Sequence, residues 1–331
     1  MYHSVTIGKK NTYTDWHLIA TERPVIAEAA PKTRYIDIPG ANGSIDLTDA
    51  LAGRAFLSNR EGSFEFYVLN DYSGYEWPKV YKEIADYLHG QVYNMWLEDE
   101  PNYMYIGRFS INQWKCQKDW SRIVIDYDLR HEKTWIGTGE EPTSTIETHS
   151  GMTKAIERRL SGSSLHSVAF GDVNTYDDLH LVPVEVPVVT MPKPKTKTYD
   201  LPGADGQLDL TELLTGEVPY SNREGSFEFY VLNDYPGYSW FDVHNKIVNY
   251  LHGKKMRMIL EDDPAFYYNG RFAVDSWKTE KDWSRLTISY NLEPFKYYTD
   301  DDMYAILDCL YDPILDNNTN KIYSSPFAYE L

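Results

Sequence analysis

The sequence contains a second copy of itself at a fixed offset of 163 positions. The fifteen residues "SNREGSFEFYVLNDY" begin at Ser58 and begin again at Ser221. At this offset, residues 3–129 and 166–292 are identical at about 69 of 127 positions, and no gap is needed. Solenoid repeats have periods of about 20–50 residues. The match therefore indicates duplication of a whole domain, and we expect two similar folded units.

The duplication divides the 331 residues into four segments. Copy 1 spans residues 1–131 and copy 2 spans residues 165–298. Between them, residues 132–164 form a connector that begins polar and carries a short predicted helix in "MTKAIERRL". Residues 299–331 form a C-terminal tail. Its acids precede apolar residues in "DDDMYAILDCLYDPIL", which predicts a helix with an acidic first turn.

Each copy is predicted to be mainly β. The stretch "GSFEFYVL" alternates Phe64, Phe66 and Val68 on one face with polar residues and a tyrosine on the other, as in a half-buried strand. Three more strands are predicted in "YNMWLED", "YMYIGRFSI" and "SRIVIDYDL", separated by "DEPN" and "QWKCQKDW". Short strands that end in Pro-Gly turns are predicted in "TRYIDIPG" and "KTYDLPG".

One helix is predicted in each copy. Between Trp77 and His89 the apolar positions, among them Val80, Ile84 and Leu88, follow helical spacing, and Gly90 suits the position after the helix. Copy 2 repeats the pattern up to Gly253. We therefore expect two tandem β-sandwich or barrel domains (mainly β, α+β), each with one flanking helix.

Charge and cysteine content exclude several classes of protein. The net charge of −18 argues against general nucleic-acid binding and against an anionic membrane surface. The two cysteines, Cys116 and Cys309, do not make a disulfide framework, so a reducing compartment is expected. The N-terminal residues lack an apolar core and no stretch approaches 18 apolar residues, so neither a signal peptide nor a transmembrane helix is expected.

No pattern in the sequence predicts catalysis. Nucleophile elbows, phosphate-binding loops, dinucleotide fingerprints and zinc motifs are all missing. The acidic turns "LEDEP" and "LEDDP" lack calcium-loop spacing, so we interpret them as solvated ends of strands. A hydrolase that uses their paired acids is the alternative. We expect no enzyme, no catalytic residue, no cofactor and no metal.

Three kinds of residue recur between the copies. The histidines His3, His17 and His89 are interpreted as structural. The tryptophans Trp114 and Trp120 are interpreted as packing on the flanking helix or at a subunit contact, with a sugar-stacking platform as the alternative. The arginines are expected to form salt bridges within the fold or across a subunit contact. They are Arg60, Arg108 and Arg122, with the copies Arg223, Arg271 and Arg285.

The order of short motifs in each copy resembles the N-terminal ring-forming (belt) domain of the distal tail proteins of long-tailed bacteriophages (siphoviruses). In copy 1 the motifs are "PGANGSIDLT", Arg60, "FEF", "YLHG" and "LEDEPNYMYIGRF". In copy 2 they are "PGADGQLDLT", Arg223, "FEF", "YLHG", "LEDDPAFYYNGRF" and "LEPFKYY". The resemblance covers about 260 of the 331 residues. Copy 1 closes differently, with "LRHEKTW", and a second belt-like unit stands where the family has a distinct C-terminal domain.

The resemblance implies a structural protein of the virion tail tip or baseplate, made in the host bacterial cytoplasm. It implies a β-sandwich akin to tail-tube subunits, six of which surround a channel. Its partners would be the tail tube protein above, and the baseplate hub and receptor-binding proteins below. Phage DNA would pass through without specific binding, which suits the acidic charge. A tandem carbohydrate-binding (host-receptor-binding) protein and a tail tube protein are the alternatives.

The resemblance leaves two assemblies open. If both copies occupy equivalent places in one ring, a homotrimer makes a pseudo-hexamer; if they stack as two rings, the assembly is a homohexamer. Identical contact surfaces favour the first. Burial does not explain why the polar ends of the repeated stretch are unchanged, so we predict inter-subunit contacts there. These residues are Asn59, Arg60, Glu61, Asn70 and Asp71, and Asn222, Arg223, Glu224, Asn233 and Asp234.

Overall fold

A computed structural model describes most of the chain. The described residues are 2–68, 76–116, 120–138, 141, 146, 152–203, 205–213, 215–231, 239–279 and 284–299. The predicted C-terminal helix falls within residues 300–331 and lies outside the described residues. None of the helices in the described part is long and apolar enough to cross a membrane.

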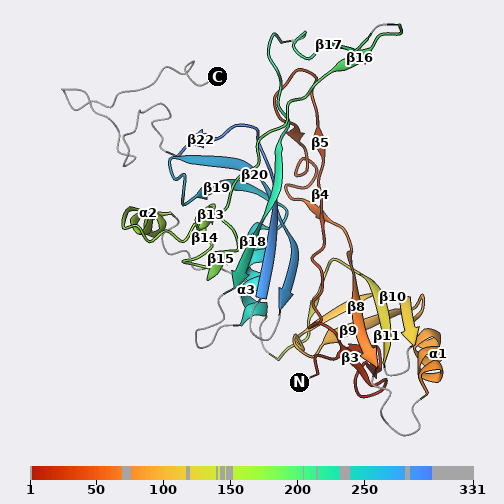
Figure 1. Cartoon of the computed structure of the whole chain (residues 1–331). Helices are drawn as coiled ribbons and strands as arrows, with labels where there is room; N and C mark the ends of the chain where they lie inside the picture. The colour runs from red at the N-terminus through yellow and green to blue at the C-terminus, as the bar shows by residue number, and fades with distance from the viewer. Residues whose placement is uncertain are drawn as a thin grey trace.

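Copy 1 folds into one curled antiparallel sheet of eight strands (Figure 1). The strand order is β2-β1-β9-β10-β11-β8-β3, and β12 pairs with β10. The strands are β1 (Val5–Ile7), β2 (Lys10–Asn11), β3 (Leu18–Ala20), β8 (Arg60–Val68), β9 (Val92–Leu97), β10 (Tyr103–Cys116), β11 (Ser121–Leu129) and β12 (Thr134–Trp135).

Copy 2 repeats this topology strand for strand. Its order is β14-β13-β19-β20-β21-β18-β15, and β22 pairs with β20. The strands are β13 (Val168–Phe170), β14 (Val173–Asn174), β15 (Leu181–Pro183), β18 (Arg223–Val231), β19 (Lys254–Leu260), β20 (Phe266–Thr279), β21 (Ser284–Leu292) and β22 (Tyr297–Tyr298). The predicted fold class, mainly β with flanking helices, is confirmed.

The alternating pattern of the repeated stretch decides which face of β8 is buried. Phe64, Phe66 and Val68 are buried, whereas Ser63 and Tyr67 point outward and are exposed. Strand β8 pairs with β11 along its whole length, so the apolar faces of both strands meet in one core. Copy 2 has its own core built from the equivalent residues.

One helix flanks each sheet, as predicted. Helix α1 (Trp77–Leu88) lies against β10 and buries Ile84 and Leu88, and helix α3 (Trp240–Leu251) does the same in copy 2. Gly90 follows α1 at φ 75°, a conformation that glycine adopts without strain. The predicted connector helix is α2 (Thr153–Leu160).

Strand β10 differs from the prediction. The sequence predicts that the strand ends before "QWKC", but the strand continues to Cys116. A β-bulge between Ile111 and Gln113 shifts its register against β11 and lets pairing go on to Ser121. The consequence is that Trp114 lies on the sheet next to α1 and not in a turn.

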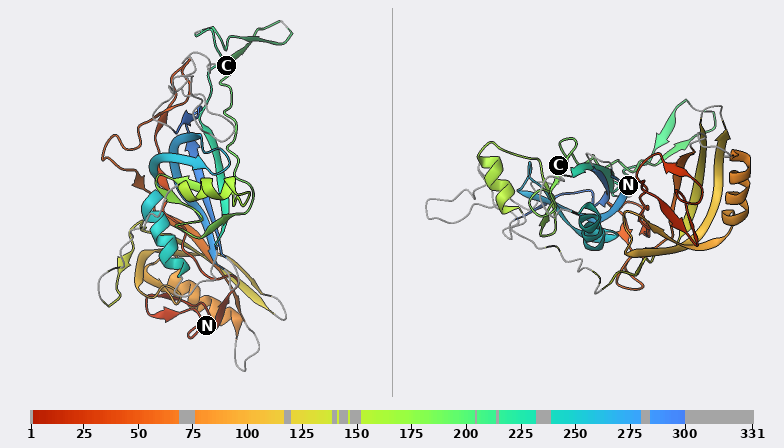
Figure 2. Two further views of the ribbon diagram at one scale, coloured as in Figure 1. Left: turned by 90° about the vertical axis from the view of Figure 1, so that its left-hand side faces the viewer. Right: turned by 90° about the horizontal axis from the view of Figure 1, so that it is seen from below.

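The predicted Pro-Gly stretches do form strands, but outside the two eight-stranded sheets. They belong to long arms that leave the sheets: arm 1 (residues 21–58) and arm 2 (residues 184–221). Arm 1 carries β4 (Pro31–Lys32), β5 (Tyr35–Ile36), β6 (Ile45–Asp46) and β7 (Phe56–Leu57); arm 2 carries β16 (Thr198–Asp200) and β17 (Gln207–Asp209). Arm 1 runs along copy 2, while arm 2 projects beyond both sheets (Figures 1 and 2).

Candidate assembly interface

The most extensive polar contact between the copies is an arginine fork. Arg271 on β20 donates from Nε and Nη2 to Asp46 at 2.9 and 2.8 Å, and from Nη1 and Nη2 to Asp49 at 3.0 and 2.9 Å. A further bond reaches the main-chain oxygen of Gly253. Arg271 is 4 % exposed. Charge-assisted, two-pronged bonds of this kind fix orientation as well as adding energy, so the fork locks arm 1 onto copy 2.

Two ring nitrogens of copy 2 hold the backbone of arm 1. Trp277 donates from Nε1 to the oxygen of Ile26 at 3.0 Å, and His252 donates from Nε2 to the oxygen of Ala29 at 2.8 Å. The other nitrogen of His252 accepts from the amide of Val274, which fixes its tautomer. Extended backbone of arm 1 is thereby paired although it lies outside any sheet.

The hairpin tip of arm 1 rests on the base of arm 2. Lys195 binds Asp37 at 2.9 Å and the oxygen of Gly43 at 2.5 Å. Asn222 accepts from the amide of Ser44 at 3.0 Å. The contacts run from the base of arm 1 to its tip, and we call the copy 2 residues that make them docking surface 2. It comprises Lys195, Asn222, His244, His252, Gly253, Arg271 and Trp277.

A buried carboxylate marks the middle of this interface. Glu28 of arm 1 pairs with Arg60 at 2.6 Å and lies 3.9 Å from His244 of α3. Burial works to raise the pKa of Glu28, but the charge of Arg60, which also donates a hydrogen bond to the carboxylate, outweighs it and lowers the pKa. Burial lowers the pKa of His244 to about 4, against the attraction of Glu28. The site therefore holds a charged acid beside a neutral imidazole.

The same arm in copy 2 meets nothing comparable in the described part of the chain. Val25 of arm 1 packs against the copy 2 core, whereas its equivalent Val188 is 73 % exposed. Met191, the equivalent of Glu28, is 80 % exposed. An added Cβ at Gly43 would meet Asn222 at 3.0 Å, whereas one at its equivalent, Gly206, would meet nothing within 4 Å.

No arm covers the equivalent surface of copy 1 in the described part of the chain. Arg108, the counterpart of Arg271, is exposed, and Trp114 is 43 % exposed where Trp277 is 7 %. A Cβ at Gly253 would meet arm 1, but one at Gly90 would meet nothing within 4 Å. We call this docking surface 1; its residues are Lys32, Asn59, Tyr81, His89, Gly90, Arg108 and Trp114, each 163 positions before its counterpart.

The predicted contact residues fall into four groups. Asn222 contacts arm 1, as described. Arg60 is buried within copy 1, and Arg223 binds main-chain oxygens of Pro294 and Thr190 within copy 2. Asn59, which donates to Asp128 at 2.7 Å, Glu61 and Glu224 lie exposed at the starts of their strands. The remaining four, Asn70, Asp71, Asn233 and Asp234, lie outside the described residues.

The sequence pattern does not predict that the acids of the arm hairpins make contacts. Asp46 and Asp209 both stand in the recurring "DLT". Asp46 binds Arg271, but no local pattern predicts this pair, because the two residues are 225 positions apart. The recurrence of Arg108 and Arg271 was the available signal.

The acidic turns are engaged in protein contacts. Asp99 binds His3 at 2.8 Å and Arg23 at 3.0 Å, and buried Glu261 accepts from the amide of Ser167 at 2.7 Å. Among the described residues, no group of three or more His, Cys, Asp or Glu side chains is arranged to hold a metal ion. The structural interpretation of His3 agrees with these contacts. The expectation that the acidic turns are solvated is wrong, because the side chain of Asp99 is 2 % exposed and Glu261 is buried, each paired within the protein.

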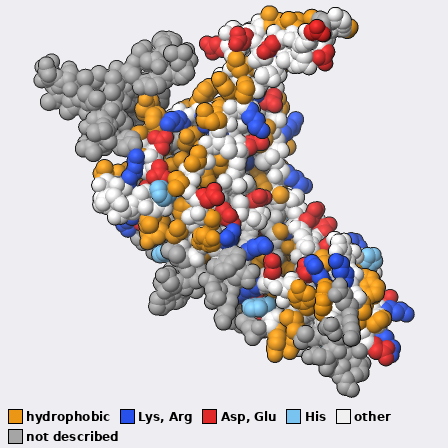
Figure 3. All heavy atoms as spheres, viewed as in Figure 1, with side chains coloured by type: hydrophobic (Ala, Val, Ile, Leu, Met, Phe, Trp, Pro, Cys, Tyr) orange, Lys and Arg blue, Asp and Glu red, His pale blue; other side chains and the backbone are white. Residues whose placement is uncertain are grey.

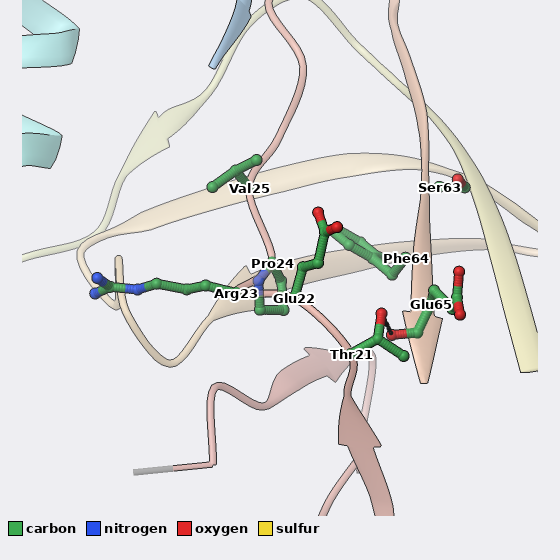
Figure 4. Close-up of a pocket in the computed structure, with 8 residues that line it drawn as sticks. All are labelled: Thr21, Glu22, Arg23, Pro24, Val25, Ser63, Phe64 and Glu65. Atoms are coloured by element: carbon green, nitrogen blue, oxygen red, sulfur yellow. Dashed lines mark hydrogen bonds between the residues drawn. The ribbon is translucent and has the colours of Figure 1, made fainter. Parts of the chain in front are cut away.

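A shallow hollow of about 220 Å³ lies at the base of arm 1 (Figure 4). Its lining residues are Thr21, Glu22, Arg23, Pro24, Val25, Ser63, Phe64 and Glu65. The hydroxyl of Thr21 donates to the main-chain oxygen of Glu65, Arg23 pairs with Asp99, and the Glu65 carboxylate pairs with Arg122. These groups serve the attachment of the arm to its sheet.

No protein-family model and no curated protein sequence matches this chain. The chain is similar to the SPP1 Dit (gp 19.1) protein, described as a paradigm of the hub adsorption apparatus in Gram-positive infecting phages, with a TM-score of 0.31 and 18 % identity. The match covers 41 % of this chain and spans about half, 52 %, of that one. The di-domain ARO/CYC StfQ from the steffimycin biosynthetic pathway matches with a TM-score of 0.08 and 6 % identity, over 80 % of this chain and 75 % of that one.

Proposed function

We propose that this protein is a structural component of a phage tail, building a ring at the distal end of the tail tube. The observation that carries the proposal is the grip of arm 1 on copy 2. It joins two units, each with belt-like motifs in order, through an arm that contains the "PGANGSIDLT" motif. One chain thus already contains one joint between neighbouring units, and rings are built from repeated joints of one kind.

In this role the ring would connect the tail tube protein to the baseplate hub and the receptor-binding proteins. The channel would admit phage DNA without holding it, since 50 Asp and Glu outnumber 32 Lys and Arg and give the chain a net charge of −18, which repels phosphate. We propose no catalytic residue, cofactor or metal. The protein would act in the virion and be made in the cytoplasm of the bacterial host.

The contacts of Trp114 weaken the carbohydrate-binding alternative. The ring of Trp114 is stacked on Tyr81 of α1 with centroids 4.3 Å apart, so one of its two faces serves packing. Trp120 packs its edge against Tyr67 at 5.9 Å. Both agree with the interpretation that these tryptophans serve packing.

Negative-stain electron microscopy of the purified full chain tests the proposal. We expect closed rings with a central channel. Single particles at every concentration, or open filaments without rings, would contradict it.

A further inference from the structure

We infer that arm 2 of one chain binds docking surface 1 of a second copy of this chain. The contact would repeat, between chains, the grip of arm 1 on docking surface 2 within a chain. It deepens the proposed function, on which it rests only for the expectation that the joints close into a ring. The pairing of surfaces itself is argued from the contacts within the chain.

The charges of the two surfaces match. The counterpart of Arg271 is Arg108, and the counterparts of its two carboxylates are Asp209 and Glu212. All three are exposed in the single chain. Two further ion pairs of the inner contact also have counterparts of the same charges: Lys195 with Asp37 and Lys278 with Glu22 become Lys32 with Asp200 and Lys115 with Glu185. A basic docking surface on this acidic chain thus faces an acidic arm.

Contacts to the backbone need no particular side chain on the arm, so they carry over directly. His89 and Trp114 keep the ring nitrogens with which His252 and Trp277 bind arm 1. The oxygens that they would meet belong to Pro192 and Val189, the counterparts of Ala29 and Ile26.

Where the chemistry differs between the copies, both sides of the contact change together. Glu28 faces His244 across the inner contact, a charged acid beside an imidazole. Their counterparts are Met191 and Tyr81, a thioether and an aromatic ring, which attract each other through sulfur–aromatic contact. Arm 1 on docking surface 1 would instead bury the Glu28 carboxylate against the Tyr81 ring.

A second position shows the same paired change. Arg23 of arm 1 lies over the ring of Phe241, with its guanidinium carbon 5.1 Å from the ring centre. The counterparts are Val186 and Pro78, two apolar residues. An arginine against an aromatic ring is replaced by one apolar contact, so each arm suits the docking surface of the other copy.

Exposure of the arms supports the pairing most clearly at the base. Val188 and Met191, near the base of arm 2, are 73 % and 80 % exposed, where arm 1 is covered. The hairpin residues Ile36 and Ile45 of arm 1 remain 41 % and 47 % exposed although arm 1 is docked. Apolar and acidic side chains gather on the projecting arm at the top of Figure 3.

Arm 2 cannot reach docking surface 1 of its own chain, so the docking surface that it binds must belong to a second chain. Arm 2 projects beyond copy 2, at the end of the molecule opposite copy 1 (Figures 1 and 2). Docking surface 2 is already occupied by arm 1. Each chain therefore offers one free arm at one end and one free docking surface at the other, the arrangement of a head-to-tail contact.

Charge reversal on the full chain tests the pairing, with mass photometry and analytical ultracentrifugation as readouts. Arg108→Glu alone, and Asp209→Lys with Glu212→Lys, should each raise the dissociation constant of self-association by about 30-fold or more, as for a broken buried charge pair. The triple variant combines Arg108→Glu with Asp209→Lys and Glu212→Lys and so restores opposite charges. Its dissociation constant should be at least tenfold lower than that of either parent variant. Recovery also shows that the variant chains fold.

Matched controls carry the same charge changes elsewhere on the surface. Lys9→Glu lies in an exposed turn of copy 1, and Asp172→Lys with Glu157→Lys changes exposed residues of copy 2 and of the connector helix α2; both should associate like the unaltered chain. Rings that persist in Arg108→Glu, or a triple variant no better than its parents, would overturn the pairing but leave the ring proposal intact. A chain that stays monomeric at all concentrations would overturn both.

Discussion

Arg271 and Arg108 occupy equivalent positions, and only the first is buried in the single chain. Arg271→Ala would leave Asp46, whose side chain is 11 % exposed, without its main counter-charge. Breaking a buried pair costs about 3–5 kcal/mol. We expect roughly 3 kcal/mol because Asp49 keeps access to water. Urea unfolding of copy 2, followed by tryptophan fluorescence, measures the loss, since Trp277 lies in the same contact.

Arg108→Ala is the matched control for that measurement. Its side chain is exposed in the single chain, so the free energy of unfolding of the monomer should change by less than about 0.5 kcal/mol. Equal losses in the two variants would show that the arginine stabilises its own sheet and that the fork to arm 1 contributes nothing.

His244 gives the interface a pH dependence. Its ordinary pKa is 6.5 and burial lowers it to about 4 in the folded chain. Between these values the unfolded chain binds the proton more readily, so the stability present above pH 6.5 is lost as the pH falls toward 4. The full shift corresponds to about 3 kcal/mol. The other charged and titratable groups that act on the His244 imidazole are Arg60, Lys133, His252 and Glu28. The pKa of about 4 already reflects their effects.

Unfolding midpoints at pH 7 and pH 5 check this dependence, at a protein concentration low enough to avoid self-association. His244→Phe keeps a ring between α3 and Trp277 but cannot titrate. We expect the midpoint of the unaltered chain to fall more steeply with acid than that of the variant. Parallel pH profiles would show that His244 does not titrate in this range.

At the scale of elements, the tip of arm 1 is held by a turn that glycine alone fits well. Gly43 has φ 68°, and an added Cβ would meet Asn222 at 3.0 Å and Pro294 at 3.1 Å. Gly43→Ala should therefore combine backbone strain of about 1–2 kcal/mol with loss of the contact to copy 2. Gly206→Ala, with φ 82° and open space around it, should show the strain alone.

Limited proteolysis distinguishes these two glycine variants. Arm 1 should become more susceptible to cleavage in Gly43→Ala, whereas cleavage of arm 1 should be unaltered in Gly206→Ala. If both variants leave arm 1 equally protected, then the tip of the arm adds nothing measurable to the joint between the copies.

The elements that the sequence predicted well are those set by local rules. Strand β8 follows from alternation, and α1 follows from helical spacing and from Gly90 after its end. Strand β10 was predicted too short because a bulge allows pairing to continue beyond a polar stretch. The short Pro-Gly strands were predicted as strands, but nothing local indicates that they leave the sheet.

At the scale of the whole molecule, sequence identity alone does not locate the joint between the copies. Identity is highest along β8, whose Arg60 serves its own copy. The fork to arm 1 uses residues that also recur, but so do core residues, so recurrence does not separate the two. The joint depends on which copy a long arm reaches, and that is decided by contacts more than 200 positions apart, such as the 225 between Asp46 and Arg271.

The binding of arm 1 within its own chain also constrains the number of chains in a ring. Two stacked rings of six would need arm 1 on docking surface 1 of a neighbour, yet arm 1 already binds docking surface 2 of its own chain. A single ring with alternating copies uses every arm and every docking surface once. If the ring has six units, as the resemblance to belt domains implies, each chain supplies two of them, so we predict three copies of the 38.5 kDa chain per ring, measured by native mass spectrometry. Six copies would mean that arm 1 leaves its own chain on assembly, in which case Arg271→Ala should promote ring formation and not merely destabilise copy 2.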